Sequence, residues 1–108
     1  MPDANISQWG WVIIWEFLVR PESRQKFESL YGRAGVWARF FARGQGYLGT
    51  ELIRDKHDGR RYVTLDFWAS RVAYEGFREQ YRAEYEAIDS ECEDMTESEV
   101  EIGRFERV

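Results

Sequence analysis

Runs of apolar and polar residues along the chain predict four β-strands. Residues 12–19, 47–54 and 61–68 are rich in β-branched and aromatic side chains, which suit the pleated surface of a sheet. Residues 100–107 alternate with the two-residue period that places successive side chains on opposite faces of a strand. An Asp-Gly pair between the second and third segments favours a tight reversal, so these two are expected to form a β-hairpin.

Apolar residues at helical spacing fill the segments between these strands. Pro21 suits the first turn of a short helix that a glycine ends, and a second short helix is predicted over residues 36–43. Ser70 is a typical N-cap for a longer helix, whose apolar face contains Ala73, Phe77, Tyr81, Tyr85, Ile88 and Cys92. A straight helix over residues 70–95 would be roughly 39 Å long against roughly 27 Å for an eight-residue strand, so we expect a break near residues 80–84.

The resulting order of elements is β-α-β-β-α-β, which predicts an α+β fold of the ferredoxin-like, split β-α-β type. In this fold two helices cover one face of a four-stranded antiparallel sheet. Both sides of residues 12–19 are apolar, with Ile13 and Phe17 on one side and Val12 and Ile14 on the other. A sheet face open to water would not tolerate this pattern, so we expect a second copy of the chain to cover it in a homodimer.

Composition and charge narrow the class of protein. The length suits one domain, which we assign to residues 1–108. The net charge is -5, and residues 84–101 hold nine acidic residues and no basic one, which we interpret as a solvated face. Nucleic acid is not an expected partner, because an acidic chain without a dense basic stripe lacks the charge that binds phosphates. No apolar run approaches the ~20 residues of a membrane span, and residues 1–10 lack a secretory pattern, so we expect a cytoplasmic protein without membrane contact.

The residues that usually bind metals or cofactors are scarce. Cys92 is the only cysteine and His57 the only histidine, which excludes an internal disulfide and a thiolate metal cluster. Residues 44–49 match the G-x-G-x-x-G fingerprint of dinucleotide sites, but they end a predicted helix and open a strand, which is the reverse of the required context. We therefore expect no metal and no cofactor.

Carboxylates in the middle of predicted strands are the first candidates for chemistry. They are Glu16, Glu51 and Asp66. One that faces the interior would have a shifted pKa and could transfer protons; the alternative is that all three pair with arginines such as Arg104. Asp66 is favoured, because it lies two residues from Trp68 on the same side of its strand.

Two aromatic residues are the second candidates. Trp68 ends the third strand, and Tyr74 follows in the first turns of the long helix. Together they would border a cavity between sheet and helices, with an indole N–H and a phenol hydroxyl as polar groups. The alternative is that both are ordinary core residues.

Several runs resemble the antibiotic biosynthesis monooxygenase family. The likeness covers about residues 12–106 and rests on Tyr47-Leu48-Gly49-Thr50-Glu51-Leu52 after Trp37, Phe40 and Phe41, on Tyr62 to Ser70 leading into Tyr74 and Phe77, and on Glu101-Ile102-Gly103. The resemblance implies a dimeric α+β barrel built from ferredoxin-like subunits. This agrees with the dimer expected from the apolar strand.

The resemblance also implies a range of functions. Some members oxidise polycyclic phenols or anthrones to quinones with O2 and no cofactor, which would make this protein a monooxygenase of a small aromatic or quinol-like molecule. The alternative is a non-catalytic, dimeric module that binds a small ligand or has a regulatory role. Haem degradation is disfavoured, because it requires an asparagine on the first strand and an iron-binding histidine on the second helix of the fold. The first strand has no asparagine, and residues 70–95 contain no histidine.

For the quinone-forming members, the resemblance places a tryptophan and a tyrosine at Trp68 and Tyr74, which would bind the substrate's oxygens. The family's asparagine is replaced by Thr64 and its helix arginine by Ile88. Asp66 is then the candidate base. The predicted substrate-binding residues are Thr64, Phe77, Trp37 and Phe41.

Overall fold

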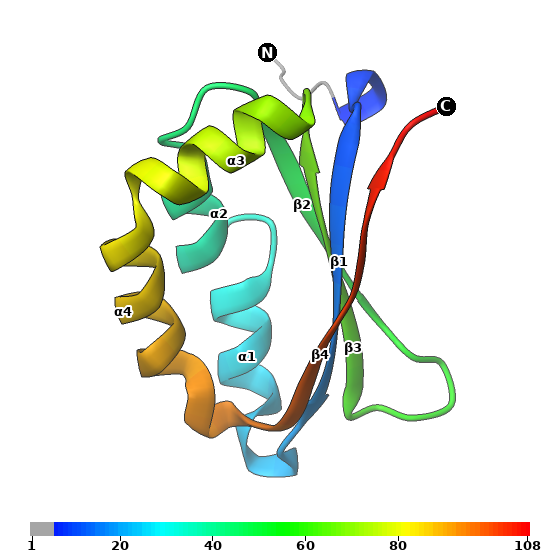
Figure 1. Cartoon of the computed structure of the whole chain (residues 1–108). Helices are drawn as coiled ribbons and strands as arrows, with labels where there is room; N and C mark the ends of the chain where they lie inside the picture. Colours follow the sequence, from blue (N-terminus) through cyan, green and yellow to red (C-terminus); the bar gives the residue numbers. More distant parts are fainter. Residues whose placement is uncertain (1–5) are drawn as a thin grey trace.

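The computed structural model describes residues 6–108 and shows one antiparallel sheet with helices on one side (Figure 1). The strands are β1 (Trp11–Val19), β2 (Tyr47–Arg54), β3 (Arg61–Trp68) and β4 (Thr96–Glu106). They lie side by side in the order β2-β3-β1-β4, and each neighbouring pair is antiparallel. The predicted α+β, ferredoxin-like fold with its split β-α-β topology is confirmed.

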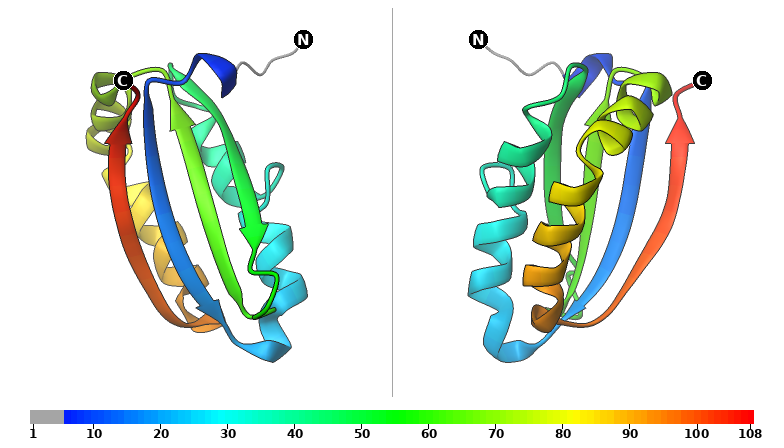
Figure 2. Two further views of the ribbon diagram at one scale, coloured as in Figure 1. Left: turned by 90° about the vertical axis from the view of Figure 1, so that its right-hand side faces the viewer. Right: turned by 60° about the vertical axis from the view of Figure 1, so that its left-hand side comes forward.

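The helices form a single layer against the sheet, as the two views of Figure 2 show. They are α1 (Arg24–Tyr31), α2 (Val36–Phe41), α3 (Arg71–Gln80) and α4 (Arg82–Cys92), with short 3-10 turns at Ile6–Gln8, Pro21–Ser23 and Glu93–Met95. The predicted break in the long helix is confirmed at Tyr81, between α3 and α4. As expected, the Ser70 side chain caps α3 by accepting the backbone N–H of Ala73 at 3.1 Å.

The start of the last strand differs from the prediction. β4 begins at Thr96, four residues before the predicted Val100, because Ser98 and Glu99 already pair with Leu18 and Phe17 of β1. Residues 97–99 carry only polar side chains, so no apolar alternation marked them as strand. Backbone hydrogen bonding to a central neighbour extends the strand instead.

The core lies between the sheet and the helix layer and consists largely of aromatic rings. Val19, Phe27 and Trp68 have no solvent exposure at all. Edge-to-face ring pairs connect β1 and α1, for example Phe17 against Phe27 with ring centres 5.2 Å apart. Apolar burial on this scale is the main source of stability for a domain of this size.

The opposite face of the sheet is largely apolar, apart from paired charges such as Glu16 with Arg61, and has no layer over it in the monomer. Val12, Phe67 and Phe105 lie in one row across β1, β3 and β4, and Val63 lies beside Ile53. Ile53 is 53% exposed and Phe105 45% exposed. This is the face that the sequence predicts a second copy to cover.

Candidate functional site

A cavity of about 270 Å³ lies between the helix-facing side of the sheet and the helices. The apolar part of its wall is entirely aromatic: Trp15, Phe17, Tyr31, Trp37, Phe41 and Tyr85. Its volume is close to the lower end of the roughly 300–1,000 Å³ typical of small-ligand sites. The cavity therefore suits a flat molecule of a few rings.

Strand register places the polar residues of the cavity floor. Thr50, Asp66 and Arg104 occupy one row across the sheet, because Thr50 pairs with Asp66, Asp66 with Ile13 and Ile13 with Arg104. Thr64 lies two residues before Asp66 on β3 and therefore on the same side of the sheet. Each of these polar side chains lines the cavity.

Asp66 is the carboxylate at the centre of this floor. Its Oδ1 accepts a hydrogen bond of 2.7 Å from Thr50 Oγ1, and the Tyr47 hydroxyl lies 2.6 Å from the same Thr50 oxygen. Since the Thr50 hydrogen is directed to Asp66, Tyr47 donates to Thr50. Burial raises the pKa of Asp66 to about 6, and the Thr50 hydrogen bond opposes that rise. A carboxylate of this kind is mostly ionised at neutral pH and still basic enough to take a proton.

The helix layer contributes one cation to the cavity. Arg78 of α3 donates from Nη1 to the Tyr74 hydroxyl at 2.9 Å, and its guanidinium carbon lies 3.7 Å from the centre of the Tyr85 ring. The other arginine of the cavity, Arg104, is paired with Glu101 at 2.9 Å.

Three acidic residues of α4 and β4 also line the cavity. They are Asp89 of α4 and, on β4, Glu101 and the exposed Glu99. Partial burial raises the pKa of Glu99, and the nearby charges of Asp89 and Glu93 raise it further. The α4 and β4 part of the lining is therefore mainly acidic, with Arg104 as its one basic residue.

The structure brings four of the predicted site residues together and sets three apart. Trp37, Phe41, Thr64 and Asp66 line the cavity. The other three are buried and lie outside its lining: Trp68, Tyr74 and Phe77. Tyr74 instead borders a separate surface depression with Arg78 and Arg104. The Trp68 ring packs against the other two, with ring centres 5.6 Å from Tyr74 and 5.3 Å from Phe77. Of these three, Tyr74 is connected to the cavity through its hydrogen bond with Arg78.

Sequence reasoning missed Thr50, Arg78 and Tyr85. Thr50 had a usable signal, because the hairpin register that pairs Arg54 with Tyr62 also brings Thr50 opposite Asp66. Arg78 follows Tyr74 by one helical turn, but the direction of a long arginine side chain depends on what packs around it. Tyr85 was predicted only as part of an apolar helix face.

Two of the three strand carboxylates pair with arginines, which was the alternative to an inward-facing carboxylate with a shifted pKa. Glu16 pairs with Arg61, and Glu51 pairs with Arg33 at 2.9 Å, whereas Asp66 forms no ion pair within the described residues. Arg104, offered as a partner for these carboxylates, pairs with Glu101 instead. The inward-facing alternative applies to Asp66 alone.

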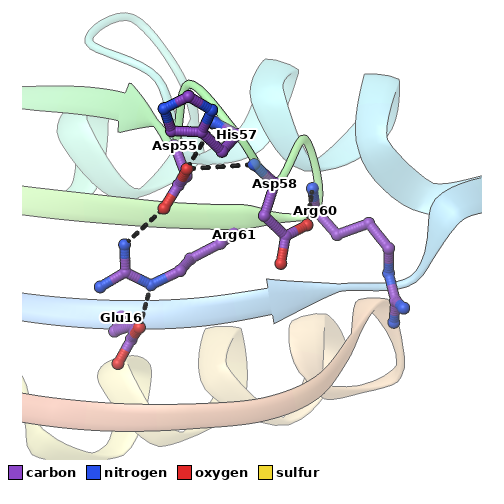
Figure 3. Close-up of polar contacts among 6 residues, drawn as sticks. All are labelled: Glu16, Asp55, His57, Asp58, Arg60 and Arg61. Atoms are coloured by element: carbon purple, nitrogen blue, oxygen red, sulfur yellow. Dashed lines mark hydrogen bonds and ion pairs between the residues drawn. The ribbon is translucent and has the colours of Figure 1, made fainter.

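His57 lies at the exposed tip of the β2–β3 hairpin, as Figure 3 shows. There the Asp55 carboxylate accepts the backbone N–H groups of His57 and Asp58 at 2.7 and 3.0 Å and also binds Arg61. These contacts shape the turn. Among residues 6–108, no group of three or more His, Cys, Asp or Glu side chains is arranged to hold a metal ion. Nor does that part of the chain contain a helix long and apolar enough to cross a membrane.

Comparison with known families agrees with this arrangement. The sequence model of the antibiotic biosynthesis monooxygenase family matches residues 11–88, which include β1 to β3, α3 and most of α4. This chain belongs to that family. None of the curated protein sequences matches it.

Solved structures share the fold of this family member. SnoaB from Streptomyces nogalater, described as a cofactor-independent oxygenase, superposes with a TM-score of 0.72 at 21% identity, over 93% of this chain and 94% of SnoaB. A Bordetella bronchiseptica protein with the same family description gives a TM-score of 0.65 at 22% identity, over 92% of this chain and 98% of its own. At these identities the likeness shows the fold alone.

Proposed function

We propose that this protein is a cofactor-independent monooxygenase that oxidises a small aromatic or quinol-like molecule with O2. The observation that carries the proposal is an aromatic cavity whose floor holds a carboxylate, Asp66, with a raised pKa and no arginine partner. Membership of the family and the likeness to SnoaB support the same reaction class.

The chemistry begins with removal of a proton from the substrate. Asp66 takes it from a phenol or an activated C–H group and leaves a phenolate or enolate between the aromatic walls. This electron-rich anion transfers an electron to O2 and then forms a C–O bond, which gives a hydroperoxide after protonation. Loss of water yields the quinone, so that a CH2 group and O2 become a carbonyl and H2O. One oxygen atom enters the product and the other leaves as water.

The predicted residues outside the lining have a supporting part in this proposal. Trp68 and Phe77 give the cavity its shape from the core side, and Tyr74 acts through Arg78. Thr64, Trp37 and Phe41 contact the rings of the substrate directly. A buried, fixed cage of this kind orients the reacting carbon toward Asp66.

Oxygen uptake tests the proposal. The purified protein is given an anthrone or a dihydroxynaphthalene without added metal, flavin or nicotinamide, and uptake above the spontaneous rate is expected. Asp66→Asn should lower the rate by about 10²- to 10⁴-fold, as expected for loss of a general base. Asp94→Asn, the same change at an exposed site outside the cavity, should leave it unchanged. Failure of every such substrate, or equal rates for Asp66→Asn and wild type, would refute the proposal.

The second candidate is a non-catalytic, ligand-binding or regulatory module. It is favoured by the position of Trp68, which is fully buried and does not face the cavity. In this case the cavity would bind a naphthol or an anthrone with no oxygen uptake, and Trp68→Phe or Tyr74→Phe would have no rate to change.

We also propose the predicted homodimer, formed through the outer face of the sheet. The exposed apolar side chains of Ile53, Val100 and Phe105 lie on that face. Analytical ultracentrifugation should give twice the mass of one chain. Leu65→Glu, in the centre of the face, should halve it, whereas Thr64→Val on the opposite side should not. A wild-type monomer at micromolar concentration would contradict the dimer.

A further inference from the structure

Arg78 is a cation without a counter-ion at the edge of an aromatic cavity. Within residues 6–108, no carboxylate lies within ion-pairing distance of its guanidinium, and its Nε is fully buried without a hydrogen-bond partner. The arginines on either side along the same helical segment differ, because Arg71 pairs with Glu75 and Arg82 with Glu79. A desolvated, unpaired charge is costly, which is a reason to look for an anion that would meet it.

Two contacts fix the guanidinium in place. The Tyr74 hydroxyl accepts a hydrogen bond from Nη1 at 2.9 Å, and the Tyr85 ring lies under the guanidinium at 3.7 Å. Neither contact neutralises the charge. They hold the group against the cavity wall, with donors still free to bind a ligand.

Arg78 and Asp66 approach the cavity from opposite layers of the fold. Asp66 projects from β3 in the floor, whereas Arg78 comes from α3 in the helix layer, and the two do not form an ion pair. A flat ligand between sheet and helices would therefore have a base on one side and a cation on the other. The other charges around the cavity are those of Asp89, Glu99, and the Glu101–Arg104 pair. On its outer side Arg78 borders a surface depression that Glu75, Glu79 and Glu86 also line, none of them within ion-pairing distance of its guanidinium.

We infer that Arg78 binds the oxyanion of the phenolate or enolate formed in the cavity, and that Tyr74 is the residue that positions it. A preorganised donor at the place where charge develops stabilises the anion more than it stabilises the neutral ligand. This inference rests on the proposed function for its substrate class. Its test, however, needs no turnover.

The test measures the ionisation of a bound phenol. 2-Naphthol is the probe, because its phenolate absorbs at longer wavelength than its neutral form and can be titrated by absorbance in the bound state. An adjacent cation lowers a pKa by about 1–3 units. Binding to the wild-type protein should therefore lower the naphthol pKa by at least about one unit relative to Arg78→Met, a tenfold difference in the ionisation constant.

Three variants make the measurement specific. Arg82→Met removes an exposed arginine near the same helix break. The pKa of naphthol bound to this variant should equal the value in the wild type. Arg78→Lys keeps the charge and should retain part of the shift. Tyr74→Phe keeps the Arg78 charge but removes the bond that orients it, and should give an intermediate pKa. Thermal unfolding of each variant confirms that the comparison is between folded proteins.

The outcomes separate this inference from the proposed reaction. Equal naphthol pKa values in wild type and Arg78→Met would overturn the role of Arg78, even if oxygen uptake were found. A large shift without oxygen uptake would support the role of Arg78 and refute the oxygenase. Absence of naphthol binding to the wild type would overturn the role of Arg78, whereas the oxygenase would still be decided by oxygen uptake with the other substrates.

Discussion

The two aspartates at opposite ends of the β2–β3 hairpin differ in what surrounds them. Asp55, at the turn, accepts two backbone N–H groups and binds Arg61, and these contacts hold its pKa below the usual value, the His57 N–H having the largest effect. Asp66, at the other end, has one hydroxyl partner, and burial raises its pKa to about 6. The same residue type stabilises a turn in one place and becomes a potential base in the other, because three donors bind Asp55 whereas only the Thr50 hydroxyl binds Asp66.

The largest effect expected from this contrast is on the pH dependence of oxidation. The rate should rise tenfold per pH unit below about 6 and level off above it, since Asp66 must be ionised to accept a proton. Asp55→Asn should keep this profile. In Asp66→Asn any residual rate should lose the step near pH 6. A profile measured as kcat/KM that is flat between pH 5 and 8 in the wild type would contradict the assignment.

Stability should respond in opposite directions at the two ends. The raised pKa of Asp66 means that its contribution to stability is fully present below the unfolded pKa and is lost as the pH rises through about 6. Asp66→Asn should therefore raise the free energy of unfolding at pH 8 by up to about 3 kcal/mol. Urea unfolding at pH 4 and pH 8 measures this, and the gain should vanish at pH 4.

For Asp55 the sign is reversed. Its lowered pKa gives stability that is present above the unfolded pKa and is lost as the pH falls through the folded value. Asp55→Asn should therefore lower the unfolding temperature at pH 7 and have less effect near pH 3. A higher unfolding temperature for Asp55→Asn at pH 7 would contradict this account of the turn.

The smallest effect should come from the hydroxyl partner of Asp66. Thr50→Val removes the hydrogen bond that favours the ionised carboxylate, so the pKa of Asp66 should rise by about one further unit. The step in the rate profile should move to higher pH by the same amount, with little change in the plateau. Thr64→Val, which keeps the Thr50 bond, is the matched control. Identical profiles for the two variants would show that the Thr50 bond has no influence.

The four strands, the helix break and the position of the hairpin could be predicted from the sequence. Each depends on local signals: β-branched runs, an apolar face at steps of three and four, and an Asp-Gly turn. The early start of β4 could not, because residues 97–99 are polar and become a strand only through pairing with β1. Of the seven predicted site residues, four line the cavity. Those four are Asp66, Thr64, Trp37 and Phe41, whereas Trp68 is buried and lies outside the lining.

By itself, the sequence determined the fold class and that Asp66 shares one side of β3 with Trp68, because alternation along a strand fixes which residues share a face. Tertiary structure decided which charges would be paired. Arg61 reaches Glu16, Arg33 reaches Glu51 and Arg104 reaches Glu101, and these pairings leave Asp66 and Arg78 without ionic partners in the described chain. The pairing of long, flexible side chains depends on distances between elements far apart in sequence, and only the packed sheet and helices set those distances.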